Sequence, residues 1–362
     1  MNLPSHTSAA SYADQFGRQY ASRSVSSSLG LWVLLAAAGV RGEDEQRAAA
    51  ELLADQPEGL KMALALWSAI ETPALREFVS SLPAQAATGK VPSQAEADRW
   101  VAENTDGMLT QHPSLAKAVL VLSSTIMAKT QWPRPLSVVT TSGLPGWFSG
   151  VRGALLVGEH RWASVQVHDT DSAGRVVAAV IEGVNGVVVV SVLGEPEVEP
   201  EALGRAAREI ATNPEESRVD FGTLSEGDHG LFTVQTMGGG KDAAWAYLPC
   251  WEVNDSFDVT EAPGVPELVA KLHELAGSEL PVDGTQLAVA RFDQYGFEAA
   301  AVTSMTMRSG HFSQRRSRVV KANFDRPFAV HATYSGNGPW DGMPLFDAWI
   351  TEIVSPRRDE ER

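Results

Sequence analysis

The sequence has little of what metal centres and disulfide frameworks need. It contains one cysteine, Cys250, in 362 residues, which excludes an internal disulfide and a cluster of thiolate ligands. Its eight histidines are scattered, with no pair at the spacing of metal ligands. We therefore expect no cofactor and no metal site. Cys250 lies in a strand-like run and is interpreted as a buried structural thiol.

Motifs of hydrolases and nucleotide-binding enzymes are also missing. No Gly-x-Ser-x-Gly occurs, so the nucleophile elbow of the α/β-hydrolases is absent. Neither Gly-x-Gly-x-x-Gly nor a P-loop occurs, and the glycine-rich run 237–241 lacks the spacing that holds phosphate. The chain is therefore not predicted to be an enzyme.

Positive charge is scarce except in one segment. The chain has 29 Lys and Arg against 45 Asp and Glu, a formal net charge of -16, which argues against nucleic-acid and anionic-membrane partners. Between Arg308 and Arg326, however, six basic residues accompany a single acid, Asp325. A polyanion could bind such a segment, but an exposed charged loop explains it more simply.

Long hydrophobic runs are limited to Leu29–Val40. At twelve residues this run is too short to span a bilayer. Because it follows Arg18 and Arg23, it could be the apolar region of a signal peptide, but it begins late and is interpreted as a core helix. We place the protein in the cytoplasm and leave secretion open.

The apolar content is enough for one large core or two ordinary ones. Apolar residues make up 44% of the chain, and no linker or repeat interrupts it. A capping box at Ser93 and Glu96 starts one helix, and Asn185-Gly186 suits the turn of a hairpin over Val176–Leu193. Further helices are expected at Ala9–Tyr20, Ser28–Gly39, Glu43–Ala54, Gly59–Ile70, Glu201–Ile210 and Val265–Ala276. Further strands are expected at Ala118–Ala128, Ala244–Val253, Thr285–Phe292, Ala329–Ala332 and Leu345–Val354.

The stretch from Arg291 to Phe328 has an unusual pattern. Read with a period of two, one face is almost wholly apolar and the residues that follow are polar and basic. That face carries Phe297, Ala299, Ala301, Thr303, Met305 and Met307. The pattern indicates a strand-forming segment that leads into an exposed loop.

These residues, and others along the chain, resemble the serpins. The serpin hinge has a glycine, a Thr or Ser, a Glu and an alanine run, and a Phe-Asn-Arg-Pro-Phe-like strand start follows it. The hinge is matched by Gly296, Glu298, Ala299, Ala300 and Ala301, and the strand start by Phe324–Phe328. Val40–Glu43 resembles the Ala-Arg-Gly-Glu signature, and a tryptophan-containing pattern is matched by Arg99, Trp100, Val101, Thr105, Gly107, Lys129, Trp132 and Pro135.

The resemblance implies an α+β serpin fold in a single domain over residues 1–362, with a large central mixed β-sheet, smaller sheets and eight or nine helices. It also implies a monomeric, metastable serine protease inhibitor that acts as a suicide substrate. A protease cleaves the reactive-centre loop, at about 296–323, and the upstream segment inserts into the large sheet as a new strand. A basic residue at the cleaved bond would suit a trypsin-like partner.

The resemblance also implies roles for particular residues. Counting from the hinge places the scissile bond near Arg308, Ser309 and Gly310, whereas counting back from Phe324 places it near Arg316; we favour the first. The hinge comprises Gly296, Phe297, Glu298, Ala299, Ala300 and Ala301. The region where the sheet opens comprises Ser28, Ser124, Trp132 and Gln286.

Departures from the serpin pattern favour an alternative, a non-inhibitory serpin-fold binding protein whose hinge does not insert. Phe297 replaces the Thr or Ser of inhibitors, and overpacking at such a site costs about 1 to 3 kcal/mol. Gln294-Tyr295 replaces an acidic pair, and Ser124 and Gln286 replace an Asn and a His. The loop is also longer than usual.

Overall fold

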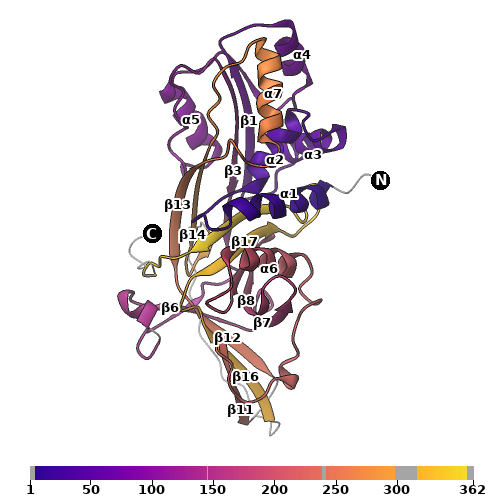
Figure 1. Ribbon diagram of the computed structural model, residues 1–362. Helices are drawn as coiled ribbons and strands as arrows, with labels where there is room; N and C mark the ends of the chain where they lie inside the picture. Colours follow the sequence, from indigo (N-terminus) through magenta and orange to yellow (C-terminus); the bar gives the residue numbers. More distant parts are fainter. Residues whose placement is uncertain (1–4, 145, 239–241, 298–315, 357–362) are drawn as a thin grey trace. The chain divides into compact units, whose positions relative to one another are not determined.

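The computed structural model describes residues 5–144, 146–238, 242–297 and 316–356 (Figure 1). They form two compact units, each built from segments far apart in the sequence. Residues 1–128, 254–289 and 334–346 make the first unit, and residues 129–253, 290–333 and 347–362 make the second.

Among the residues described, the first unit contains six helices and a three-stranded sheet of order β2-β1-β3. Its helices are α1 (Ser5–Tyr20), α2 (Ser28–Ala37), α3 (Glu43–Ala54), α4 (Pro73–Ser81), α5 (Gln94–Asn104) and α7 (Val265–Ala276). Its strands are β1 (Leu60–Ser68), β2 (Ala87–Gly89) and β3 (Leu120–Ala128). The helices α1 and α3 and the strand β3 all pack against α2.

The helix α2 is the centre of the first unit. Nine of its ten residues are buried, which confirms the core helix predicted for this apolar run. Ser27 begins the helix, because its Oγ accepts a hydrogen bond from the Gly30 amide at 3.4 Å and donates one to the Leu345 carbonyl at 2.7 Å. Within the described ranges, no helix is long and apolar enough to cross a membrane.

Two predicted elements differ from the structure. Gly59–Ile70, predicted as a helix, contains β1, which pairs antiparallel with β3 over its whole length from Leu60 opposite Ala128 to Ser68 opposite Leu120. Adjacent residues Leu64 to Trp67 are all buried, so a helix-like apolar run here belongs to a strand covered on both faces. The described parts of the chain therefore form seven α-helices, not eight or nine.

The predicted strand Ala244–Val253 is two strands in the structure. They are β12 (Ala243–Leu248) and β13 (Trp251–Asp258), and they belong to different sheets. Pro249, which has no amide hydrogen to donate to a sheet, lies at the break between them.

The second unit holds two larger sheets and the helix α6 (Pro200–Thr212). The six-stranded sheet has the order β10 (Gly227–Asp228), β11 (Phe232–Gly238), β16 (Arg316–Asn323), β12, β6 (Ala154–Gly158) and β5 (Ser137–Val139). The five-stranded sheet has the order β18 (Pro344–Ile350), β17 (Phe328–Tyr334), β9 (Val187–Leu193), β8 (Gly174–Glu182) and β7 (Ala163–Thr170). Two 3-10 turns lie at Gly146–Gly150 and Phe221–Thr223.

A four-stranded sheet of order β13-β14-β15-β4 completes the fold. Its other strands are β14 (Thr285–Phe292), β15 (Gly296–Phe297) and β4 (Thr130–Gln131). The prediction for β14 is confirmed at both of its ends.

The predicted hairpin is confirmed, and it forms part of the core of the second unit. β8 and β9 pair antiparallel, and Gly186 in the turn has φ of 87°, which glycine adopts without strain. The helix α6 packs on this hairpin through apolar residues that include Leu203 and Ile210. Gly194 lets α6 approach, because a Cβ there would lie 2.5 Å from the Leu203 side chain.

Arg208 and Asp347 form a largely buried ion pair in the second unit. An oxygen of Asp347 accepts hydrogen bonds from His331 Nδ1 at 2.9 Å and from Arg208 Nη1 at 3.3 Å. Burial by itself raises the pKa of Asp347. The nearby Arg208 charge and His331 together lower this pKa by more than burial raises it, so the pKa lies below its usual range. Folding lowers the pKa of Asp347, so Asp347 stabilises the folded protein at any pH above its pKa in the unfolded chain. This stabilisation is lost as the pH falls through the pKa of Asp347 in the folded protein.

We predict that Asp347→Asn lowers the free energy of unfolding at neutral pH by about 3 kcal/mol, because it removes the buried carboxylate that bonds to both Arg208 and His331. As the pH is lowered, the free energy of unfolding of the variant should also fall less than that of the parent protein. Urea unfolding at a series of pH values measures both effects. Asp169→Asn is the matched control, because Asp169 pairs with Arg175 at the surface and such pairs contribute about 0 to 1 kcal/mol. Equal losses in the two variants would contradict the prediction.

Candidate functional site

The predicted hinge begins inside the four-stranded sheet. The chain leaves β14 at Phe292, reverses, and returns as β15, so that Phe297 pairs antiparallel with Phe292. The other edge of β15 pairs antiparallel with β4, with Gly296 opposite Gln131 and Phe297 opposite Thr130. The first two hinge residues are therefore already a strand between β14 and β4.

Asp293 holds this reversal. Its Oδ1 accepts hydrogen bonds from the amides of Tyr295 at 2.8 Å and Gly296 at 3.2 Å. Its own amide donates to the Gly296 carbonyl at 3.0 Å. An Asp side chain that bonds to amides further along the chain is a turn-forming device, and here it sets the direction in which the hinge leaves β14.

Trp132 anchors the same reversal from the neighbouring segment. Its Nε1 donates to the Asp293 carbonyl at 3.0 Å, and its amide donates to the Tyr295 carbonyl at 2.9 Å. The indole is 4% exposed and its ring centroid lies 5.5 Å from that of Phe292. Trp132 is thus both a core residue and a hydrogen-bond partner of the hinge turn.

Phe297 has a prepared place in the core. Its side chain is 3% exposed and its ring lies edge-on to Trp251, with centroids 6.3 Å apart. Trp251 in turn stacks on Phe292 at 5.7 Å. Phe297 is therefore buried beside an aromatic neighbour at the start of β15.

The strand β4 is held by the turn of the β8–β9 hairpin. Val184 donates its amide to the Gln131 carbonyl at 2.9 Å, and the Asn185 amide group donates to the Lys129 carbonyl at 2.9 Å. Gly183 permits this close approach, because a Cβ there would lie 1.8 Å from Thr130 Oγ1. The partner strand of the hinge is thus fixed in place.

Three predicted sheet-opening residues lie in the first unit, around the start of α2. Gln286 Oε1 accepts from the Ser27 amide and its Nε2 donates to the Ser27 carbonyl, both at 2.9 Å. Ser124 Oγ donates to the Gly30 carbonyl at 2.8 Å. Ser28 is buried beside them. Together these bonds connect α2 to β14 through Gln286 and to β3 through Ser124.

Strands β3 and β14 belong to separate sheets, although the sequence predicts one large central sheet. β1 pairs with one edge of β3, and no described strand pairs with the other edge. Along Thr285–Val289, β14 has β13 on one side and no described strand on the other. Within the described part of the first unit, the second edge of β3 and the second edge of β14 therefore each lack a partner strand.

Several predicted site residues lie outside the described residues. These are Glu298, Ala299, Ala300 and Ala301 of the hinge and Arg308, Ser309 and Gly310 of the scissile region. The reactive-centre loop was predicted to extend to about residue 323. In the structure Arg316 already belongs to the strand β16, so the last part of this prediction is wrong.

Sequence reasoning missed Asp293 and Ser27. An Asp three residues before a glycine, as in Asp293 to Gly296, is a typical turn signal and could have identified the first. Ser27 could be recognised as a helix cap, but its pairing with Gln286 joins residues far apart in the sequence.

Solved structures similar to this chain cover almost all of it. One is human thyroxine-binding globulin complexed with its hormone, with TM-score 0.61 and 11% identity over 97% of this chain and 98% of that one. Tengpin, a thermophilic serpin in the native state, has TM-score 0.61 and 12% identity over 98% and 96%. Serpin48 of the insect Tenebrio molitor has TM-score 0.56 and 14% identity over 96% and 98%. No family model and no curated protein matches the sequence. At these identities the likeness concerns the fold, and it confirms the serpin fold predicted from the motifs.

We predict that Gln286→Leu lowers the free energy of unfolding by about 2 to 3 kcal/mol, because it leaves the amide and carbonyl of Ser27 without partners. Urea unfolding measures this loss. The control is Gln56→Leu, a second glutamine that bonds to backbone groups, but only within its own local turn at Leu53 and Met62. We expect only Gln286→Leu to increase amide hydrogen exchange in α2. No such increase would show that Gln286 does not connect β14 to the helix.

Proposed function

We propose, from the serpin fold of this chain, that it inhibits serine proteases by inserting its cleaved loop between β3 and β14. The observation that carries the proposal is the position of β15. Gly296–Phe297 already pairs with β14 on one edge and with β4 on the other. A strand that has begun with this pairing needs only to continue in order to fill the space between two strand edges.

Continuing the two registers supports this route. Antiparallel pairs advance in opposite directions, so Phe297 opposite Phe292 leads to Thr303 opposite Gln286. On the other edge, Phe297 opposite Thr130 leads to Thr303 opposite Ser124. The two sheet-opening residues would thus lie on either side of the same inserted residue.

The alanine run suits the same register. Ala299 would lie opposite Ala290 and Ala301 opposite Ala288, and both partners on β14 face the core. Small residues opposite small residues can pass between packed strands without overpacking. The hinge sequence and the inward face of β14 are therefore complementary.

The free energy of insertion would come from the residues that follow Phe297. Phe297 is already buried and adds little more. Met305 and Met307 on the inward face would each contribute about 1.5 to 3 kcal/mol on burial. Each new ladder hydrogen bond would add about 0.5 to 1.5 kcal/mol. The sum is several kcal/mol in favour of the inserted form.

In the proposed reaction the protease supplies the catalytic groups. Its serine oxygen bonds to the carbonyl carbon of Arg308, the bond to the Ser309 nitrogen breaks, and that nitrogen takes up the proton. Insertion of the segment from Phe297 onward then carries the ester-linked protease away from the geometry it needs for hydrolysis. The inhibitor would act as a monomer on a trypsin-like protease in the cytoplasm, without a cofactor.

The second candidate is a binding protein with the serpin fold. Two observations favour it, the bonded turn at Asp293 and the likeness to thyroxine-binding globulin, whose structure contains thyroxine. If the turn held β15 at its present length, the loop would serve only as a surface loop. The state of the protein after cleavage separates the two candidates.

We predict that limited trypsin cleavage of the loop raises the midpoint of thermal unfolding by about 10 °C or more. About 5 kcal/mol or more from burial and ladder hydrogen bonds, at about 2 °C per kcal/mol, gives this size. Differential scanning calorimetry before and after cleavage measures the change. An unchanged midpoint would favour the binding protein.

A matched pair of variants tests the register. Thr303→Glu places a charge on the face that would be buried, and Ser304→Glu places it on the opposite face. Cleavage should raise the unfolding midpoint of Ser304→Glu as in the parent protein and raise that of Thr303→Glu far less. The opposite ranking, or equal behaviour, would contradict the proposed faces.

We also predict that Arg308→Ala abolishes the covalent complex with trypsin, seen as a band stable in denaturing gels, while Arg316→Ala preserves it. The reason is that Arg308 lies at the end of the apolar strand pattern and Arg316 already lies in β16. Mass spectrometry of the released fragment identifies the cleaved bond. Loss of the complex in Arg316→Ala alone would place the scissile bond at the second basic site.

A further inference from the structure

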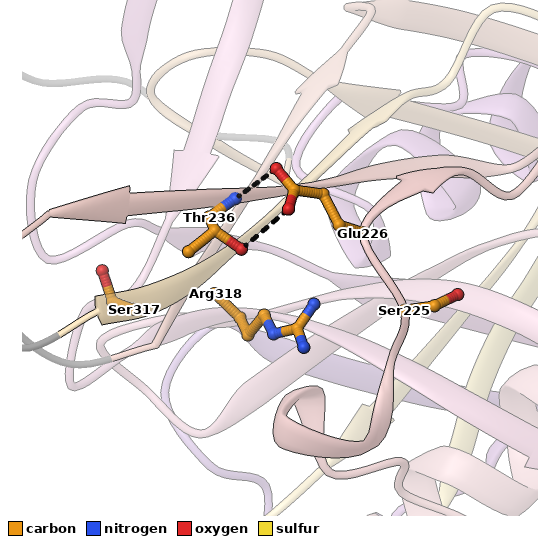
Figure 2. Close-up of a pocket in the computed structure, with 5 residues that line it drawn as sticks. All are labelled: Ser225, Glu226, Thr236, Ser317 and Arg318. Atoms are coloured by element: carbon orange, nitrogen blue, oxygen red, sulfur yellow. Dashed lines mark hydrogen bonds between the residues drawn. The ribbon is translucent and has the colours of Figure 1, made fainter.

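A polar pocket in the second unit has no part in the proposed insertion. It lies beside β10, β11 and β16 and has a volume of about 470 Å³ (Figure 2). Its wall is formed by Ser225, Glu226, Thr236, Ser317 and Arg318. Ligand pockets are usually of this size but mostly apolar. Here every lining residue is polar, so the pocket selects for a polar ligand.

Glu226 gives the pocket a fixed negative charge. Its two carboxylate oxygens accept hydrogen bonds from the amide of Thr236 at 3.3 Å and from the hydroxyl of Thr236 at 3.2 Å (Figure 2). These bonds set the orientation of the carboxylate on β11. A carboxylate accepts about four hydrogen bonds, so Glu226 retains the capacity to bind a cation.

Arg318 gives the pocket a separate positive charge. Its backbone amide donates to Asp242 Oδ1 at 2.6 Å, which positions the start of β16. Its side chain is half-buried, and the guanidinium has neither an ion pair nor a hydrogen bond with any residue that the structure describes. Figure 2 shows this guanidinium lying apart from the Glu226 carboxylate. A guanidinium binds a carboxylate through two parallel hydrogen bonds.

The charges exclude the two simplest ligands. An anion alone would be attracted to Arg318 but repelled by Glu226 in the wall and by Asp242 beside it. A cation alone would face the reverse conflict with Arg318. A ligand that carries both charges meets neither penalty, and the hydroxyl of Ser225 can bond to one of its remaining polar atoms.

We propose that this pocket binds a small zwitterion, with the chemistry of a free α-amino acid. The carboxylate of the ligand lies on the Arg318 guanidinium, and its ammonium group lies on the Glu226 carboxylate. Because the pocket is open to solvent, the side chain of the amino acid points outward. This binding site is independent of protease inhibition.

Isothermal titration calorimetry of the full chain with the standard L-amino acids tests the proposal. We expect at least one to bind, and we expect Arg318→Gln and Glu226→Gln each to weaken its binding about tenfold or more, since each removes a charge-assisted hydrogen bond. Arg161→Gln and Glu197→Gln are matched controls, because both residues are exposed and outside the pocket. These controls should leave affinity unchanged.

Modified ligands assign each charge to its partner. The methyl ester of the bound amino acid lacks the carboxylate, so it should bind the parent protein and Arg318→Gln equally weakly. The N-acetyl derivative lacks the ammonium group, so it should bind the parent protein and Glu226→Gln with the same weak affinity. The proposal is overturned if no amino acid binds, if the two pocket variants bind normally, or if Glu226→Gln binds more tightly, which would indicate an anion site.

Discussion

The hydrogen bonds that Asp293 Oδ1 accepts from the amides of Tyr295 and Gly296 determine how the predicted hinge begins in its sheet. They reverse the chain within a few residues, so β15 lies against the end of β14 and does not continue away from it. Trp132 bonds to both sides of this reversal through its indole and its amide. The direction, face and register of β15 depend on this turn.

A turn of this kind would change the energetics of the proposed strand insertion. Starting a new strand is costly because the first residues lose conformational freedom before they gain a full ladder. Here Gly296 and Phe297 are already ordered, and Phe297 occupies its aromatic site beside Trp251. Extension would then add pairs one at a time along β14 and β3. Phe297, which departs from the Thr or Ser of the serpin hinge pattern, is thus the residue that anchors β15.

Prediction from the sequence succeeded where a single segment carries the information. The structure confirms α3 at Glu43–Ala54, α7 at Val265–Ala276 and the capping box at Ser93, since apolar spacing and capping act within one or two helical turns. The prediction of a helix at Gly59–Ile70 was wrong. A continuous apolar run is compatible both with a buried helix and with a strand whose two faces are both buried. Only the pairing of β1 with β3 distinguishes them.

The sequence by itself determined the core helix α2, because apolar spacing suffices for it. Its serpin-like motifs identified the fold class. Only the tertiary structure decided that β15 lies between β14 and β4, that Gln286 holds Ser27, and that Arg318 and Glu226 line one pocket. These contacts join residues tens to hundreds of positions apart. Such pairings depend on which edges and faces meet after the chain has folded, and no local pattern records that.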